Sequence, residues 1–278
     1  MIPTWDPGDE QVLPRQDTVG WARFAARFVP MAMVTFGGLG VLMVLRLVER
    51  PLFGTARPVT PWITQAVCRT NMAILGVRTE HSGAPMRERG ALVANHGSWL
   101  DIYSLNARAR IYFVAKHEVA RWFGIGWLAR ATGTEFVERR RGAAKAQHGQ
   151  FMARLEAGHR LLFFPEGTST DGRRVLPFKS TLFEAFFDRA HRDHLWIQPV
   201  SVVYTAPEGR EERFFGWWGD MEFGPHFLAV LSAPRGGRVR ITFHDPLKVS
   251  DFPDRKAMAQ AAEERVRAGV DGYLSTRS

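Results

Sequence analysis

Residues 91–101 read Ala-Leu-Val-Ala-Asn-His-Gly-Ser-Trp-Leu-Asp, and this stretch sets the expectation for the whole fold. Its first part, residues 91–95, is apolar apart from the closing asparagine, which is typical of a strand buried on both faces. A turn with glycine and serine follows, and residues 99–107 then have a helical pattern. A buried strand that passes through a turn into a helix is the repeating unit of an α/β domain.

The chain after residue 76 continues the same alternation. Further strands are predicted at residues 111–115, 134–138, 161–164, 197–204 and 239–243, and helices at residues 119–131, 143–157, 178–189 and 255–273. Gly133, Gly158 and Gly172 fall between these segments, where glycine often ends an element. We therefore predict one α/β domain over residues 77–278.

The composition is basic and rich in aromatic residues. The 278 residues include 37 Lys and Arg against 28 Asp and Glu, a formal net charge of +9, which favours nucleic acid or an anionic membrane as partner. The basic residues are scattered without a nucleic-acid recognition motif, and 9 Trp and 20 Phe favour lipid. Because Cys68 is the sole cysteine, no intrachain disulfide or multi-cysteine zinc site is possible, and nothing requires an oxidising compartment. We expect membrane lipids as partners, no nucleic acid, and the cytoplasmic side.

An uncharged segment, residues 28–45, is the candidate membrane helix. A helix of this length reaches about 27 Å, barely the thickness of a bilayer core. A weaker apolar stretch at 62–75 allows a hairpin that dips into one leaflet instead of crossing. A buried core helix is the alternative, because Pro30 and several glycines weaken an isolated span. The predicted organisation is a tail at 1–20, membrane-attachment helices at 21–76 and the α/β domain after them.

His96 and Asp101 are the first candidates for chemistry, because active sites of α/β folds gather after the carboxyl ends of strands. If His96 lies in the turn and Asp101 in the first turn of the helix, the carboxylate can reach the imidazole. It would then fix the tautomer and stabilise the imidazolium that forms on proton uptake. Because the chain has no Gly-x-Ser-x-Gly motif, the pair suggests a general base that acts on a substrate hydroxyl. The competing interpretation is an aspartate that caps the helix beside a core histidine, with Ser98 as a further cap.

Two other clusters are candidates for substrate contact. Residues 163–168, Phe-Phe-Pro-Glu-Gly-Thr, present a carboxylate on a turn after a buried strand, although a solvated turn would explain the same pattern. Residues 133–141 end in three arginines, which usually form a solvated face. A guanidinium at the end of a strand can also bind a phosphate or carboxylate through two hydrogen bonds.

Together these clusters resemble the lysophospholipid acyltransferase family over roughly residues 75–205. The family pattern Asn-His-x-Ser-x-x-Asp matches Asn95, His96, Ser98 and Asp101. The pattern Gly-x-x-Phe-x-x-Arg matches Gly133, Phe136 and Arg139. The pattern Phe-Pro-Glu-Gly-Thr-Arg-Ser matches residues 164–168, which include Glu166, Gly167 and Thr168. A fourth block, an apolar residue before Pro and Val, matches Pro199 and Val200, with Gln198 at the apolar position.

The resemblance implies a fold, an activity and a set of site residues. The fold would be a mixed sheet flanked by helices, of the glycerolipid acyltransferase type, after a membrane-embedded helix or hairpin. His96 would take the proton from the hydroxyl of a lysolipid acceptor, with support from Asp101, and no metal or cofactor would be needed. The acyl donor would be a thioester of acyl-carrier protein or coenzyme A. The expected substrate-binding residues are Asn95, Ser98, Gly133, Phe136, Arg139, Glu166, Gly167, Thr168 and Pro199. The expected location is the inner membrane, with the catalytic domain on the cytoplasmic side.

The third block departs from the family pattern after Thr168, and this departure bears on the acceptor. Ser169 and Thr170 stand where the family has Arg-Ser, which removes a cation beside Glu166. Residues 164–172 resemble the lyso-ornithine lipid branch, whose members acylate the free hydroxyl of a lyso-aminolipid. Lysophosphatidate is the alternative acceptor, since basic residues at 173, 174 and 179 can still bind phosphate. Two further alternatives are a basic membrane-anchored protein that binds lipid without catalysis and a hydrolase that uses the same pair on water.

Overall fold

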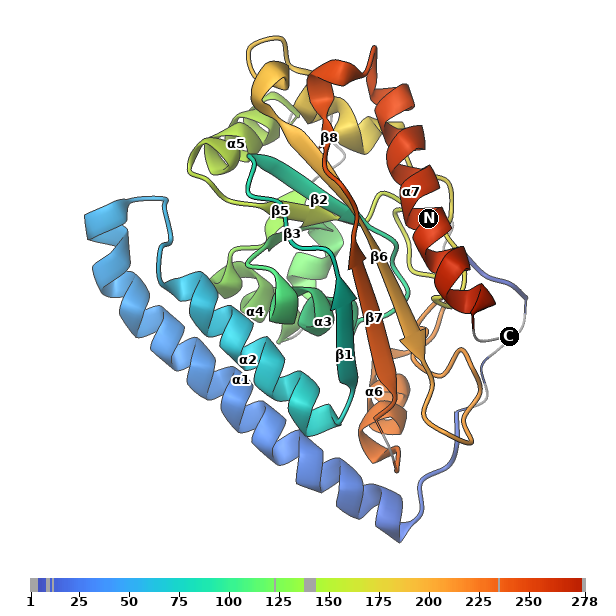
Figure 1. The fold of residues 1–278 in the computed structure, drawn as a ribbon. Coiled ribbons are helices and arrows are strands. Elements are labelled where there is room, and N and C mark those ends of the chain that lie inside the picture. The colour runs from blue at the N-terminus through green and yellow to red at the C-terminus, as the bar shows by residue number, and fades with distance from the viewer. Residues whose placement is uncertain are drawn as a thin grey trace.

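The centre of the fold is a mixed eight-stranded sheet (Figure 1). The structure is a computed structural model, and it describes residues 5–8, 11, 13–122, 124–137, 144–234 and 236–276. For residues 144–148 it describes the backbone only. Within the described residues the strand order is β1-β7-β6-β2-β5-β3-β4, and β8 also pairs with β6. Strand β6 is antiparallel to β7 and β8, and the other neighbouring pairs are parallel. The prediction of a mixed sheet is therefore confirmed.

Six strands lie where they were predicted, and two were missed. The strands are β1 (Arg78–Ser82), β2 (Gly90–Ala94), β3 (Tyr112–Lys116), β4 (Glu135–Val137), β5 (Leu161–Phe163), β6 (Trp196–Thr205), β7 (Arg238–Phe243) and β8 (Leu247–Lys248). Strand β1 is polar and pairs only with β7 at the edge of the sheet, so it carries no apolar signal. Strand β8 has only two residues.

The helices required more correction than the strands. They are α1 (Thr18–Phe53), α2 (Thr60–Leu75), α3 (Asp101–Arg108), α4 (Ile125–Thr132), α5 (Ala144–Glu156), α6 (Phe223–Ser232) and α7 (Arg255–Ser275), with 3₁₀ turns at His117–Arg121, Ser180–Phe187, Arg192–His194 and Val249–Asp251. The single helix predicted at 119–131 is wrong, because Gly124 adopts a φ of +72° and separates a 3₁₀ turn from α4. The segment predicted as a helix at 178–189 is a 3₁₀ helix. Helix α6 was missed because it is apolar almost throughout and shows no polar face.

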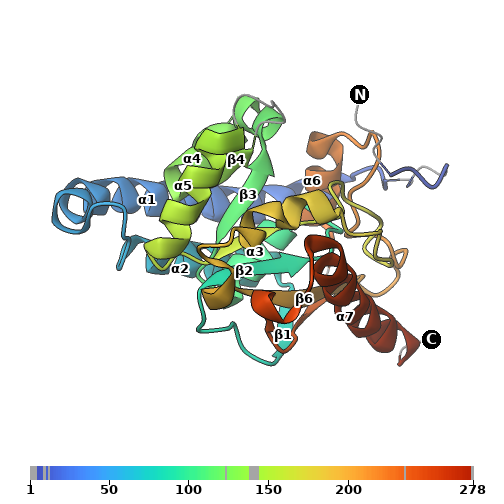
Figure 2. The same ribbon diagram turned by 90° about the horizontal axis from the view of Figure 1, so that it is seen from above.

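Alternate side chains of β2 enter two separate cores. Leu92 and Ala94 belong to a cluster that includes residues of α2, α3 and α6, whereas Ala91 and Val93 belong to a cluster that includes residues of α5 and α7. All four are fully buried, as expected for a central strand with helices on both faces. Figure 2 shows α1 and α2 on one side of the sheet and α7 on the other.

Helix α1 is a long outer helix that runs beside α2 (Figure 1). Its 36 residues extend about 54 Å, and Pro30 does not interrupt it. Gly38 allows the close approach, because a Cβ there would overlap the side chain of Val67. The Asn71 amide also donates to the Thr35 hydroxyl at 2.9 Å.

By length and composition α1 can cross a membrane, which suggests membrane association. Only 17% of its most apolar window is buried, so α1 is not a core helix of this chain. Large apolar side chains along it are exposed, including Met33, Val44 and Leu47. The division into tail, attachment helices and catalytic domain stays a prediction.

Candidate active site

Two of the predicted motif blocks meet at the carboxyl ends of two neighbouring strands. Strands β2 and β5 are parallel neighbours, with Val93 opposite Phe163, so the segments that follow them leave the sheet side by side. Glu166, in the turn after β5, accepts a hydrogen bond from the backbone N–H of His96 at 2.8 Å. The other oxygen of Glu166 accepts from the N–H of Leu176 at 3.0 Å. The carboxylate therefore joins the turn after β2 to the turn after β5.

His96 and Asp101 form the predicted pair. The distance between His96 Nδ1 and Asp101 Oδ2 is 2.7 Å. Asp101 is the first residue of α3, and the same oxygen accepts from the N–H groups of Gly97 at 3.0 Å and Ser98 at 3.1 Å. Ser98 Oγ in turn accepts from the N–H of Leu100 at 3.2 Å. Asp101 does not cap α3, because the N-cap position is Leu100 and no side chain makes a capping hydrogen bond there. Its carboxylate instead holds the turn before α3 and the histidine together, so the interpretation of Asp101 as a helix cap is wrong.

Nε2 of His96 has no hydrogen-bond partner among the residues that the structure describes. Asp101 Oδ2 accepts from two backbone N–H groups, so we expect it to accept from Nδ1 as well, and a ring protonated at Nδ1 alone has a free lone pair on Nε2. The side chain of His96 is 21% exposed, whereas that of Asp101 is 0% exposed. The ring stacks on Phe164, with centroids 4.1 Å apart and an angle of 14°. This arrangement can accept a proton from a hydroxyl group that approaches Nε2.

Tyr204 completes the surroundings of Asp101, and sequence reasoning did not single it out. Its hydroxyl donates to Asp101 Oδ1 at 2.8 Å and lies 3.0 Å from Ser104 Oγ. Burial raises the pKa of Tyr204 well above its ordinary value, and the charge of Asp101 adds to the effect, so the hydroxyl remains a donor. The sequence did contain a signal for it, because Tyr204 is the last residue of the strand predicted at 197–204. In the sheet, this end of β6 extends past the last residue of β2, on the side where His96 lies.

Asn95 and Pro199 support the sheet. The amide of Asn95 donates to the carbonyl of Val202 and accepts from its N–H, both at 2.8 Å, which extends the pairing of β2 with β6. Pro199 lies between the part of β6 that pairs with β8 and the part that pairs with β7, where its missing N–H removes no bond of the ladder. Its carbonyl accepts from the N–H of His244 at 3.0 Å. A contact of either residue with substrate stays a prediction.

The segment that departs from the family pattern lies against the turn of His96. The N–H of Thr170 donates to the carbonyl of His96 at 2.8 Å. A Cβ on Gly97 would lie 2.7 Å from Gly172 Cα, so the two glycines permit a close approach of the backbones. Asp171 pairs with Arg174 at 2.9 Å. The residues after Thr168 therefore help to hold the His96 turn in place.

Glu166 has an unusual protonation equilibrium. It is 1% exposed, and burial raises its pKa to about 8, against the two backbone hydrogen bonds, which lower it. The negative charge of Asp101 adds to the rise. Beside it, Gly167 has a φ of +74°, and a Cβ there would lie 2.5 Å from the Lys179 amine. Thr168, the next residue, is half-buried.

The second block lies apart from this cluster as far as it is described. Gly133 ends α4 with a φ of +90°, and its carbonyl accepts from the Arg154 guanidinium. Phe136 lies in β4 and is half-buried. Arg139 lies outside the described residues. The roles of these three residues in substrate binding stay predictions.

The pKa of Glu166 predicts a change of stability with pH. The pKa of Glu166 in the folded chain, about 8, exceeds its reference value of 4.5, so between these pH values the native state binds a proton that the unfolded state does not. The free energy of unfolding therefore falls as pH rises through this range, by up to about 1.4 kcal/mol per pH unit. Glu166→Gln removes the titratable carboxyl group. Denaturant unfolding at pH 5 and pH 8 should show a smaller loss of stability in Glu166→Gln than in the parent chain. The exposed-site control Glu222→Gln should follow the parent, and parallel profiles for Glu166→Gln would contradict the prediction.

Comparison with solved structures supports the fold. The crystal structure of the 1-acyl-sn-glycerophosphate acyltransferase PlsC from Thermotoga maritima superposes with a TM-score of 0.65 at 20% identity, and the match covers 93% of this chain and 97% of that chain. At this identity the likeness concerns the fold alone.

Comparison of sequences identifies the family. Residues 77–203 match the Acyltransferase family. The lyso-ornithine lipid O-acyltransferase of Rhodobacter capsulatus is 54% identical over 269 residues, 96% of this chain and 97% of that protein. The lyso-ornithine lipid O-acyltransferase of Brucella abortus is 41% identical over 71% of this chain and 75% of that protein. The resemblance inferred from the four blocks is confirmed, and the chain is an enzyme that belongs to the PlsC-type acyltransferase family.

Proposed function

We propose that the chain transfers a fatty acyl group from a thioester to the free hydroxyl of a lyso-aminolipid such as lyso-ornithine lipid. The observation that carries the proposal is the His96–Asp101 contact of 2.7 Å, which leaves Nε2 free to act as a base. The similarity to the lyso-ornithine lipid O-acyltransferases supports the acceptor.

The chemistry follows from the two side chains. His96 Nε2 takes the proton of the acceptor hydroxyl while the oxygen attacks the thioester carbonyl. The tetrahedral intermediate collapses to the new ester and expels the thiolate, which takes the proton back from the imidazolium and leaves as a free thiol. Asp101 stabilises the imidazolium between these steps. Because a thioester is already activated, we propose neither a covalent acyl-enzyme nor a metal or cofactor, with acyl-carrier protein or coenzyme A as the carrier.

The charges near the site favour an aminolipid over a phosphate headgroup. Arg174 is paired with Asp171, and Arg173 is paired with Glu212 at 2.9 Å, so both cations that follow the third block already have carboxylate partners. We propose that the headgroup of the acceptor is bound by Glu166, Gly167 and Thr168, together with Arg139, which lies outside the described residues. The amine of Lys179 beside Gly167 keeps lysophosphatidate as the alternative acceptor.

The proposed location is the inner membrane, with the catalytic domain on the cytoplasmic side. The exposed apolar side chains of α1 suit contact with lipid, and a lysolipid acceptor resides in the same membrane. Thioesters of acyl-carrier protein and coenzyme A are water-soluble donors that reach the enzyme from the cytoplasm.

His96→Ala tests the general base. In membranes that contain lyso-ornithine lipid and acyl-carrier protein thioester, the variant should transfer acyl groups at least about 100-fold more slowly, because the proton acceptor is lost. His194→Ala, which removes an exposed histidine, should keep the parent rate. Undiminished transfer by folded His96→Ala would rule out the proposed mechanism.

A competition assay tests the acceptor and the type of reaction. Equimolar lyso-ornithine lipid and lysophosphatidate are offered to the parent chain with a radiolabelled thioester, and the products are separated. We expect label mainly in ornithine lipid. Label mainly in phosphatidic acid would establish the alternative acceptor. Release of free fatty acid at the same rate without any acceptor would indicate a hydrolase, and binding of lipid without any labelled product would indicate a non-catalytic lipid-binding protein.

A further inference from the structure

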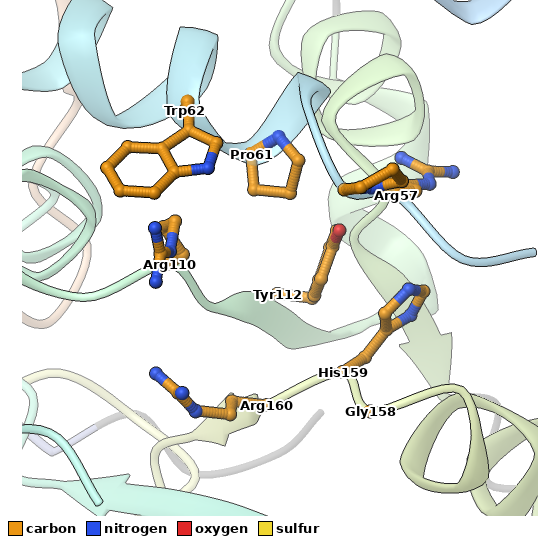
Figure 3. A pocket seen from close by; sticks show the side chains of 9 residues that line it. Arg57, Pro61, Trp62, Arg110, Tyr112, Gly158, His159 and Arg160 are labelled. Atoms are coloured by element: carbon orange, nitrogen blue, oxygen red, sulfur yellow. The ribbon is translucent and has the colours of Figure 1, made fainter. Parts of the chain in front are cut away.

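A pocket lies at the amino-terminal ends of β3 and β5, at the opposite end of the strands from His96. Figure 3 shows its lining from close by. The pocket has a volume of about 320 Å³ and is formed by the loop after α1, the start of α2, the start of β3 and the turn before β5. Figure 3 shows Arg110 and Arg160 on one side of it and Arg57 on the other. His96 instead follows the carboxyl end of β2, which is parallel to β5 and β3. Because β3 has five residues, the two ends of the strands are about 16 Å apart.

The lining of the pocket is strongly cationic. Arg57, Arg110 and Arg160 line it, and none of them forms an ion pair with any carboxylate among the residues that the structure describes. The nearby Arg154 is different, because it pairs with Glu135 at 2.7 Å.

Two carboxylates lie near these arginines without forming an ion pair with them among the described residues. Burial lowers the pKa of Arg160 and of Arg57. Against this effect, Glu88 raises the pKa of Arg160, and Glu49, near the end of α1, raises that of Arg57. Glu49 accepts from the N–H groups of Val59 and Thr60 at 2.7 and 3.1 Å. It also pairs with Arg46 at 3.0 Å. The three lining guanidinium groups therefore leave an excess of positive charge in a concave site.

Buried polar groups in the pocket lack partners. Within the described part of the chain, the Tyr112 hydroxyl, both ring nitrogens of His159 and Arg57 Nε make no hydrogen bond. Tyr112 and His159 are each only 6% exposed. Burial, together with Arg154 and Arg57, lowers the pKa of His159 to about 4, so the ring is neutral at pH 7. Since buried polar groups are almost always hydrogen-bonded, these atoms indicate a ligand with several polar atoms.

The pocket has an exposed apolar side chain in its lining, Trp62, which is 55% exposed and lies in the first turn of α2. Phe53 and Val59, which are 53% and 46% exposed, are close in the chain to the lining residues Arg57 and Pro58. The guanidinium of Arg110 lies over the ring of Trp62, 3.8 Å from its centroid. A cationic pocket bordered by such side chains suits a ligand with an anionic headgroup and apolar chains, because aromatic residues and arginines gather at membrane interfaces.

We propose that this pocket binds the phosphate group of an anionic membrane phospholipid, at a site separate from the acyl-transfer site. The phosphate oxygens accept from Arg57, Arg110 and Arg160, as guanidinium groups commonly do with phosphate. The Tyr112 hydroxyl and the neutral His159 ring supply further donors. The acyl chains lie along the exposed ring of Trp62. This site does not depend on the acceptor proposed above.

The test measures the Tm of the full-length chain in micelles of an uncharged maltoside detergent. Dimyristoyl phosphatidylglycerol should raise the Tm by a few degrees, whereas phosphatidylcholine with the same acyl chains should not, because ligand binding to the native state alone stabilises it. The double variant Arg110→Gln/Arg160→Gln should lose the shift. The control Arg87→Gln/Arg189→Gln, which removes two exposed arginines outside the pocket, should keep it.

Each other outcome overturns the proposal. An equal shift with phosphatidylcholine, or an undiminished shift in Arg110→Gln/Arg160→Gln, would show that the pocket does not bind an anionic headgroup. The same shift with inorganic phosphate or coenzyme A at equal concentration would assign the pocket to a soluble phosphate. If the double variant does not fold, Arg160→Gln alone must reduce the shift with phosphatidylglycerol.

Discussion

The buried carboxylate of Asp101 is the interaction on which the site depends. It accepts from the backbone of the turn after β2, from the imidazole of His96 and from the hydroxyl of Tyr204 on β6. A buried carboxylate is unfavourable unless donors surround it, so the turn, the helix and the strand must take their observed positions together. The same bonds that stabilise the charge also orient the histidine. The arrangement that stabilises the buried Asp101 is therefore the same arrangement that orients the imidazole of His96.

Other contacts hold this cluster against the sheet. Asn95 continues the pairing of β2 with β6, and Glu166 joins the turn after β2 to the turn after β5. The segment with Thr170 and Gly172 covers the turn from outside. Residues that match the family blocks, and residues that depart from them, thus support the backbone around His96. Their contact with substrate stays a prediction, and their place at the carboxyl ends of the strands is where active sites of α/β folds gather.

Sequence reasoning predicted the parts that local patterns control. The buried strands β2 and β5 are short apolar runs, and their turns carry His96 and Glu166, so the site could be located. The partner of Asp101 on β6 could not, because Tyr204 is more than one hundred residues away and only the register of β6 beside β2 brings it close. Strand β1 was missed because an edge strand needs no buried face, and α6 because a buried helix needs no polar face. Arg139 was predicted from the motif and lies outside the described residues.

The molecule combines an apolar outer helix, the His96–Asp101 pair at one end of the strands and a cationic pocket at the other end. The proposed mechanism requires that Asp101 hold His96 in the tautomer that leaves Nε2 free. The most direct measurement is ¹⁵N NMR of the histidine rings in the full-length chain, with the His96 signals identified by their loss in His96→Ala. We expect a neutral ring protonated at Nδ1 and unprotonated at Nε2. A neutral His96 protonated at Nε2 would contradict the proposed role of Asp101.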